Sequence, residues 1–525
     1  MIPFGHWHPD SAGINTPVCI DAKNVVAGEN GFQPLAEAEP STAQLSSEVR
    51  GAVSVLLDDG AVQTFAGTQN SLFQLNDVAS WDNVSGIEYV YDDDGELVTN
   101  EDLPILTDAG ETILDDFGEI VTIADPVTIA GDDYLVGSGE QWKFVLYGTL
   151  LIATNVVDGP QKFDLTTSAN FEALGGSPPA ARYIDVVREF VFLGAVSGNE
   201  KRMQWSAIGN AEGWTAGTNE SDYQDFPNGG PVRGVIGGET VYVFQANKVT
   251  RGTYVPGSET IFQFDEVEGA AGLAAPHSLV RLRADAYYLA ADGIRRFDLR
   301  SASSVQIGTK KWAKWFLADK KTGTDLTVLG AANPVKPIIV WAYVSRDNIG
   351  TTPNRLLIYD WSLDEATYAE LTVETLVQWL SPGVTLDTMD GYGTVDDLPF
   401  SFDSPFWRGG AQVMGLFSDD HALSLQAGSS MTATITTADG SEGGRRLFKG
   451  TRPAVDTAEA QIALAVRERD ADSVAFGAAE SMEDTGICPA HKSGNIARAR
   501  LTIPAGATWT SAKGLETLAT RQGQR

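Results

Sequence analysis

Short apolar runs separated by turn-forming residues dominate the chain. Runs such as Phe190–Leu193, Val241–Phe244 and Ala286–Ala290 are bounded by Gly, Asp, Asn or Pro, whereas helical spacing of apolar positions is nearly absent. The 54 glycines agree with this pattern, because tight turns need residues that tolerate a positive φ. The pattern predicts an all-β protein.

The apolar runs pair into a loose repeat, in which one strand is followed by a polar turn and a second strand. The copies are Val62–Ala66 with Ser71–Leu75, Thr149–Ala153 with Gln161–Asp164, Phe190–Leu193 with Arg202–Ser206, Val241–Phe244 with Lys248–Arg251, Ala286–Ala290 with Asp292–Asp298, Ile339–Tyr343 with Arg355–Trp361, and a weaker seventh, Gln412–Phe417 with His421–Leu425. From the second to the sixth copy the spacing is roughly 40–65 residues, and propeller blades recur every ~40–50 residues. Radial stacking covers both faces of each four-stranded sheet. We therefore predict an irregular β-propeller of about six blades; a β-sandwich, or two stacked β domains with unrelated hairpins, is the alternative.

The same patterns divide the chain into four parts. We expect an N-terminal extended arm at residues 1–46, the propeller at 47–87 and 134–430, an acidic inserted β-hairpin arm at 88–133, and a small C-terminal β domain at 431–525. The last part alternates apolar and polar positions, for example over Gln461–Val466 and Ala497–Ile503, as half-buried strands do.

The inserted arm is the most acidic stretch of the chain. No Lys or Arg occurs between Gly51 and Trp142, and glycines that precede apolar pairs indicate tight turns into strands. We favour a solvated acidic insertion. A projecting contact for a partner or for the lumen of an assembly is the second interpretation. A calcium site at Asp92, Asp93 and Asp94 is the third, although no EF-hand spacing follows these residues.

Charge and cysteine content exclude several classes of protein. The chain of 525 residues has 37 Lys and Arg against 70 Asp and Glu, a formal charge of −33. An acidic surface repels phosphate, so we expect no sequence-specific or wrapping contact with nucleic acid. An acidic surface also suits the wall of a passage along which DNA slides without binding, although solubility is the simpler explanation of the negative charge. Cys19 and Cys488 alone cannot form a disulfide framework or a zinc site.

The sequence also gives no sign of a membrane or secretion signal. No window approaches the ~20 apolar residues of a membrane helix, so we expect no membrane insertion. The opening residues lack a basic region followed by an apolar stretch, so we expect no secretory signal peptide.

Candidate chemistry is sparse. The five histidines are His6, His8, His277, His421 and His491. His6 and His8 flank Trp7 as a possible metal-binding pair, but no third ligand is visible and a packed or hydrogen-bonded role is favoured. Paired acids such as Asp396 and Asp397 could serve a glycosidase, yet such pairs arise by chance among so many carboxylates. No nucleophile-elbow, zinc-protease, phosphate-loop or dinucleotide motif occurs. We predict no enzyme activity, no catalytic, cofactor-binding or metal-binding residues, and no cofactor.

Aromatic residues give a stronger signal than the titratable ones. Seven tryptophans lie at predicted strand ends or just after turns: Trp205, Trp214, Trp312, Trp315, Trp341, Trp361 and Trp407. Packing between blades is favoured over carbohydrate stacking. Lys310–Trp315 is the one clear basic cluster, and we favour a surface turn or an inter-subunit salt-bridge patch over a nucleic-acid contact.

A series of motifs resembles a family of phage virion proteins. The series comprises Phe4–Asp10, Ala22–Val26, Gly31–Leu35, Trp142–Phe144, Ala153–Asp164, Gln204–Ala207, Phe262–Asp265, Leu357–Trp361 and Ile503–Trp509. The family opens with F-G-x-W-x-P-D followed by A-K-N-V and Y-x-P-L. Taken together in this order, the motifs make the chain similar to the tail nozzle or tail-hub proteins (tail tubular protein B-like, DNA-stabilisation) of short-tailed bacteriophages.

The resemblance implies a structural virion protein. It implies a hexameric homo-oligomer ring of irregular propellers below the portal and head-tail adaptor protein. The ring extends the DNA channel, retains the genome, and anchors a tail fibre or tip protein. Genomic dsDNA would pass through the lumen without sequence-specific binding, and the protein would reside in the virion tail after assembly in the host cytoplasm. It implies no catalytic residues. A receptor- or carbohydrate-binding tail propeller, a propeller glycan hydrolase and a distal tail component of a long-tailed phage remain alternatives.

Overall fold

In the computed structural model, strands account for nearly all regular structure. The structure describes residues 2–57, 61–89, 128–130, 134–258, 260–380, 412–441 and 443–522. Within these residues one α-helix, α1 (Ala313–Asp319), and two short 3-10 helices, η1 (Pro276–Ser278) and η2 (Asp325–Thr327), interrupt the strands. None of these helices is long and apolar enough to cross a membrane. The prediction of an all-β protein is confirmed.

Seven antiparallel sets of four strands follow one another along the chain, six as separate sheets and one as part of a nine-stranded sheet; we call each set a sheet. The first three are β6 (Ala52–Leu56), β7 (Val62–Gly67), β8 (Leu72–Leu75) and β9 (Trp81–Asn83); β12 (Lys143–Tyr147), β13 (Leu150–Thr154), β14 (Gln161–Asp164) and β15 (Glu172–Ala173); and β16 (Ala181–Val187), β17 (Phe190–Val196), β18 (Asn199–Trp205) and β19 (Asp222–Asp225). The next two are β20 (Val232–Ile236), β21 (Thr240–Gln245), β22 (Val249–Tyr254) and β23 (Phe262–Glu266); and β24 (Val280–Leu282), β25 (Asp285–Ala290), β26 (Gly293–Asp298) and β27 (Ser303–Gln306).

The last two of these sheets recruit strands from elsewhere in the chain. The sixth consists of β28 (Leu329–Ala332), β29 (Ile338–Tyr343), β30 (Arg355–Asp360) and β31 (Glu365–Glu370). The seventh consists of β32 (Thr375–Leu380), β33 (Gln412–Phe417), β34 (Ala422–Ser430) and, from the N-terminal segment, β5 (Ala36–Gln44). The start of the chain therefore completes the last sheet.

The seven sheets form a closed series. The first strands touch at six of the seven steps, since β6 touches β12 and β32, β16 touches β12 and β20, and β28 touches β24 and β32. At the remaining step, η1 lies against β20 of the fourth sheet and β25 of the fifth. Buried residues fill the spaces between successive sheets in separate clusters. The predicted number of about six blades is not confirmed, because seven four-stranded sheets are present.

The predicted hairpins correspond to the middle of each sheet. All seven copies of the repeat fall on the second and third strands, such as β17 with β18 and β29 with β30. These strands are covered on both faces: every residue of β17 and of β29 is buried. Continuous burial explains why their sequences are the most apolar.

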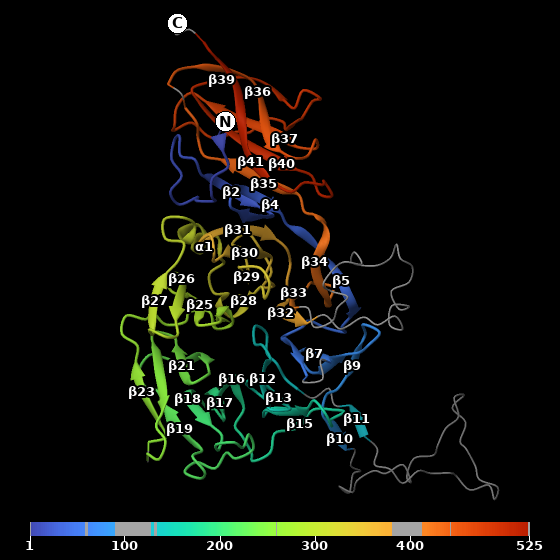
Figure 1. Cartoon of the computed structure of the whole chain (residues 1–525), viewed down its shortest axis with the longest axis vertical. Coiled ribbons are helices and arrows are strands. Elements are labelled where there is room, and N and C mark those ends of the chain that lie inside the picture. The colour runs from blue at the N-terminus through green and yellow to red at the C-terminus, as the bar shows by residue number, and fades with distance from the viewer. Residues whose placement is uncertain are drawn as a thin grey trace, which may run out of the picture.

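A second region combines both ends of the chain in two further sheets. One contains β3 (Val25–Gly28), β4 (Gly31–Pro34), β41 (Ala512–Arg521), β36 (Arg446–Val455) and β39 (Cys488–Gly494), with β1 (Ile2–Pro3) on β41. The other contains β2 (Cys19–Lys23), β35 (Ala433–Thr437), β40 (Ile496–Ile503), β37 (Gln461–Arg467) and β38 (Glu480–Ser481). We call these two sheets the terminal sandwich. Figure 1 shows it at one end of the molecule, with both termini, and the β6–β27 sheets at the other.

The two regions share a sheet and a core. β2 joins the edge strand β31 in parallel through the Lys23–Tyr368 pair, so the sixth sheet continues into the terminal sandwich as nine strands. The largest cluster of buried residues spans this junction. The N-terminal segment, expected as an extended arm, thus supplies strands to the terminal sandwich and to the seventh sheet.

Only the base of the acidic insertion is described. β10 (Ile87–Tyr89) pairs antiparallel with β11 (Thr128–Ala130). Asp92, Asp93 and Asp94, the calcium alternative, lie outside the described residues, as do Asp396, Asp397 and Trp407.

Candidate functional site

The motif Phe4–Asp10, which we call the opening motif, packs where the series of sheets meets the terminal sandwich. We call this place the junction. The indole of Trp7 is fully buried and packs edge-on against Trp315, with 4.7 Å between ring centroids, and beside Tyr368 at 5.5 Å. Gly5 allows this approach, because a Cβ at its position would collide with the carbonyl oxygen of Pro17. The motif therefore attaches the N-terminal segment to β31 and α1.

Asp10 supplies the missing cap of α1 from more than three hundred residues away. Its carboxylate accepts hydrogen bonds from the backbone N–H groups of Lys314, at 2.7 Å, and Trp315, at 2.9 Å. The residue at the helix's own N-cap position, Trp312, makes no such bond. The opening motif and the basic cluster Lys310–Trp315 are two separate features in the sequence, and these hydrogen bonds join them in the structure.

The histidine pair of the opening motif binds a carboxylate. His8 Nε2 lies 2.8 Å from Glu365 Oε2, and His6 Nδ1 lies 3.8 Å from the same oxygen. Lys311 Nζ contacts Glu365 at 3.0 Å and Asp364 at 2.8 Å. Burial disfavours the charged form of Lys311, but hydrogen bonds to Asp364 and Glu365 outweigh it and raise the pKa of the lysine. These contacts fit the hydrogen-bonded role favoured for the histidines.

One lysine of the basic cluster and His421 pair with carboxylates of the same chain, and His491 is exposed. Lys311 pairs with carboxylates of its own chain, while Lys310 and Lys314 are exposed. His277 is buried in η1, and burial lowers its pKa well below the usual value. His421 Nδ1 lies 2.7 Å from Glu374, whose pKa burial raises. In the parts of the chain that the structure describes, no three His, Cys, Asp or Glu residues gather where a metal ion could bind.

The singled-out tryptophans that the structure describes are buried or half-buried. Trp205 stacks on Phe192 at 5.3 Å, and its indole N–H donates to the carbonyl of Glu220 at 2.9 Å. Trp214, Trp312 and Trp341 are buried, and Trp315 and Trp361 are half-buried against the junction core. These positions agree with packing between sheets and leave little indole face for a sugar ring.

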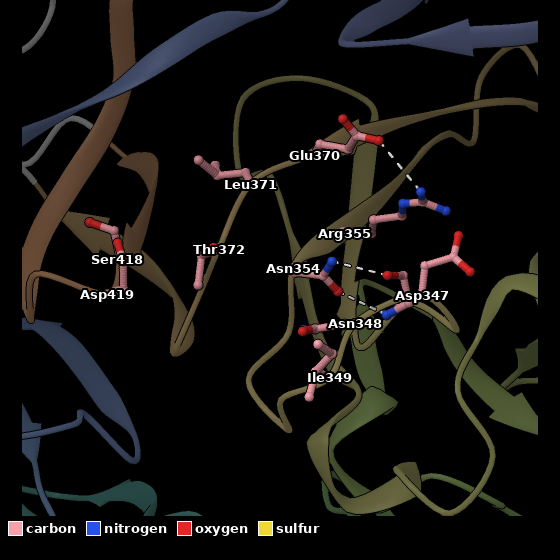
Figure 2. Close-up of a pocket in the computed structure, with 11 residues that line it drawn as sticks. Asp347, Asn348, Ile349, Asn354, Arg355, Glu370, Leu371, Thr372, Ser418 and Asp419 are labelled. Carbon is pink, nitrogen blue, oxygen red and sulfur yellow. Dashed lines mark hydrogen bonds and ion pairs between the residues drawn. The ribbon is translucent and has the colours of Figure 1, made fainter.

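An open groove lies between the sixth and seventh sheets. Its volume is about 690 Å³, and it is open to solvent (Figure 2). Asp347, Glu370 and Asp419 contribute carboxylates to its wall. Arg355 is its one cation, and this guanidinium already pairs with Glu370 at 3.4 Å and with Asp319. An open, acidic groove without an enclosed floor suits a contact with another protein better than capture of a small molecule.

One wall of this groove is a rigid loop with an apolar tip. Lys321 Nζ donates to three successive carbonyl oxygens, those of Asn348, Ile349 and Gly350, at 2.9, 3.2 and 3.0 Å. Asn354 holds the base of the loop: its Oδ1 accepts from the Ser345 N–H at 2.8 Å, and its Nδ2 donates to Ser345 Oγ at 3.0 Å (Figure 2). The side chain of Ile349 at the tip is 99% exposed.

A second cavity opens at the edge of the terminal sandwich, between β38 and β39. Its volume is about 390 Å³, and its lining includes Ile462, Leu464, Cys488 and Ala490. Thr451 Oγ1 in its wall is buried and makes no hydrogen bond within the structure. Burial raises the pKa of the Cys488 thiol to about 11, with nearby Glu480 and Glu483 adding to the effect.

Sequence reasoning missed both of these features. The groove is built from turns at residues 345–355, 370–372 and 418–419, and the cavity from the strands β36 to β39, which are divided between two sheets. The one available signal was an isoleucine inside the polar stretch Arg346–Gly350, where an apolar residue has no local reason to be.

Comparisons with known proteins do not place the chain in a family. No protein-family model matches it, and no curated protein matches it. Among solved structures it is similar to a computationally designed protein, Ika8, at 9% identity over 75% of this chain and 98% of that one, with a TM-score of 0.34. The extracellular domain of a putative hybrid two-component system from B. thetaiotaomicron shares 11% identity over 84% of this chain and 47% of that one, with a TM-score of 0.38. Streptogramin B lyase shares 11% identity over 65% and 91%, with a TM-score of 0.35.

Proposed function

We propose that the chain is a structural subunit of a phage tail, one copy of a six-membered nozzle or hub ring below the portal and adaptor. The ring extends the DNA channel, retains the genome and anchors fibres or a tip. The protein acts as a scaffold and not as an enzyme, and resides in the virion. The observation that carries the proposal is the way the motifs behind the resemblance pack in space.

The most separated of these motifs converge in one core. Residues from five of them lie in the junction cluster: Phe4, Trp7, Ala22, Val25, Phe32, Leu357, Tyr359, Ile503, Ala507 and Trp509. The first and last motifs are about five hundred positions apart in the sequence. A set of motifs that builds one core is what shared architecture requires, and chance similarity to a series of short peptides gives no such meeting.

We further propose that the seven sheets are blades of a β-propeller. Their first strands touch in order except between the fourth and fifth sheets, which η1 bridges, and the seventh sheet combines β34 with the N-terminal strand β5. Completing the last sheet with the first segment of the chain joins both ends of the series, which stabilises a closed ring of sheets against opening.

In this proposal the DNA channel is enclosed by several copies and not by one propeller. Leu326, ahead of the sixth sheet, lies against Gly139, ahead of the second sheet, where an added Cβ would meet it at 3.3 Å. Connections from opposite sides of the series therefore meet across its axis and leave no path for a duplex. The acidity of the chain lowers the affinity of a multi-copy channel wall for DNA.

The receptor- or carbohydrate-binding propeller is the weaker candidate. It requires exposed aromatic faces, whereas the singled-out tryptophans among the described residues are buried or half-buried.

Particles assembled without this chain test the proposal. We expect such heads to lose packaged DNA, measured as nuclease-protected DNA per head, because the channel below the adaptor is then open. Complementation with the intact gene serves as the control. Heads that retain their genome and infect normally without the chain would contradict the proposed function.

A further inference from the structure

The charge of the chain is divided unequally between its two regions. Residues 1–430 contain 25 Lys and Arg against 59 Asp and Glu, whereas residues 431–525 contain 12 against 11. The terminal sandwich is thus almost neutral, and nearly all of the negative charge belongs to the rest of the chain. Contacts between copies are least repulsive where the terminal sandwich of one copy meets the acidic region of another.

Each region carries one half of a possible contact, a projecting apolar side chain on one and a cavity on the other. The acidic region presents the Ile349 loop, with its apolar tip held in place by Lys321. The terminal sandwich presents the cavity lined by Ile462, Leu464, Cys488 and Ala490. A preorganised apolar side chain entering an apolar cavity is the arrangement that contributes most to protein interfaces, because little conformational entropy is lost.

The charges beside the two features are also complementary. Arg346 and Asp347 flank the Ile349 tip and are exposed. Glu480 and Lys492 line the cavity, and Lys492 Nζ donates to the carbonyl of Leu464 at 2.5 Å without a carboxylate within ion-pair distance among the described residues. Asp347 can therefore face Lys492 while Arg346 faces Glu480.

We propose that the Ile349 loop of one copy inserts into the cavity between β38 and β39 of the next copy. The contact is heterologous, because two different surfaces meet, so each copy offers one free loop and one free cavity. Such contacts build rings where the rotation closes. The inference rests on the proposed ring and names the surfaces that form it.

A disulfide trap tests the contact, because Cys488 already lines the cavity. In an Ile349→Cys variant, oxidation at high protein concentration should link residue 349 of one copy to Cys488 of the next. Non-reducing gels should show a ladder of dimers, trimers and larger species, and peptide mapping should identify the 349–488 link. Cys19 does not line the cavity and should not take part.

Two matched variants set the controls. The double variant Ile349→Cys/Cys488→Ser should give no ladder and at most a 349–349 dimer. A cysteine at Val335, which is 73% exposed on another turn of the sixth sheet, should give no link to Cys488. A ladder that persists without Cys488, or an equal yield from position 335, would overturn the inference.

Charge exchange gives an independent measurement. Asp347→Lys and Lys492→Glu should each weaken association about tenfold, and the double variant should recover most of that loss. Rings that form unchanged in both single variants and without the 349–488 link would refute this contact and leave the proposed function standing. Absence of self-association in solution and of the link in assembled tails would refute both.

Discussion

At the scale of single residues, ion pairs fasten the turns of the terminal sandwich. The carboxylate of Asp439 accepts two hydrogen bonds from Arg467, at 2.9 and 2.8 Å, and two from Arg498, at 3.0 and 2.8 Å. Burial disfavours the charge of Asp439, but the two guanidinium groups outweigh it and hold its pKa below the ordinary value. One side chain thereby connects β37 and β40 to the end of β35.

We expect Asp439→Asn to lower the free energy of unfolding by about 2 kcal/mol near neutral pH, since hydrogen bonds to charged groups are lost. The pKa of Asp439 is lower in the folded chain than in the unfolded chain, so its contribution is complete above the unfolded pKa. The contribution is lost as pH falls through the folded pKa, and the variant and the natural chain should converge there. Urea titrations at several pH values measure the difference.

Asp470→Asn is the matched control for this prediction. Asp470 also contacts Arg467, at 2.8 Å, but its side chain is 73% exposed. Its loss should cost less than about 1 kcal/mol. Equal losses in the free energy of unfolding of the two variants would contradict the larger contribution that we assign to the double pairing at Asp439.

At the scale of elements, α1 depends on a residue far away in the sequence. It has seven residues and no side-chain cap of its own, so the carboxylate of Asp10 provides the acceptors for its first free N–H groups. The strength of this contact decides how firmly the opening motif is attached to the sixth sheet.

Asp10→Ala should destabilise the junction by about 1 kcal/mol, the usual cost of losing a helix cap. Asp10→Asn should cost less, because its amide oxygen still accepts a hydrogen bond. Amide hydrogen exchange of Lys314 and Trp315 reports the effect directly. Unchanged protection of these two amides in Asp10→Ala would contradict the assignment of the cap.

The elements that sequence patterns predicted are those with continuous burial. β17, β21, β25 and β29 are buried almost throughout, so their apolar runs stood out, and their hairpin partners followed from the short turns. Outer strands such as β15 and β19 are exposed or half-buried and carry no clear pattern. Each four-stranded sheet was therefore visible only through its two central strands.

Long-range pairing explains what the patterns could not predict. β5 joins β34 and β2 joins β35, each across several hundred positions, and no local signal marks such partners. For the same reason the sequence showed Trp7 and Trp315 as separate motifs, although their rings touch. The groove beside Arg355 was equally hidden, because turns of two different sheets form it, and the cavity beside Cys488 was hidden because its consecutive strands are divided between two sheets.

At the scale of the whole molecule, the proposed assembly into a ring has to agree with the architecture and the charge of the chain. The series of sheets and the terminal sandwich share a sheet and a core, so motion of one is transmitted to the other. The connections ahead of the second and sixth sheets approach each other at Gly139 and Leu326, so in the proposed ring the channel for DNA lies between copies. A ring of copies, each meeting the next through unlike surfaces, satisfies both conditions.

Electron microscopy of the chain in its assembled form, purified or in tails, tests this account most directly. The account predicts rings around a central channel, with a mass near six times the 56.1 kDa of one chain and seven-sheet bodies arranged about the axis. A monomeric particle in every assembly, or copies stacked without a common channel, would contradict it.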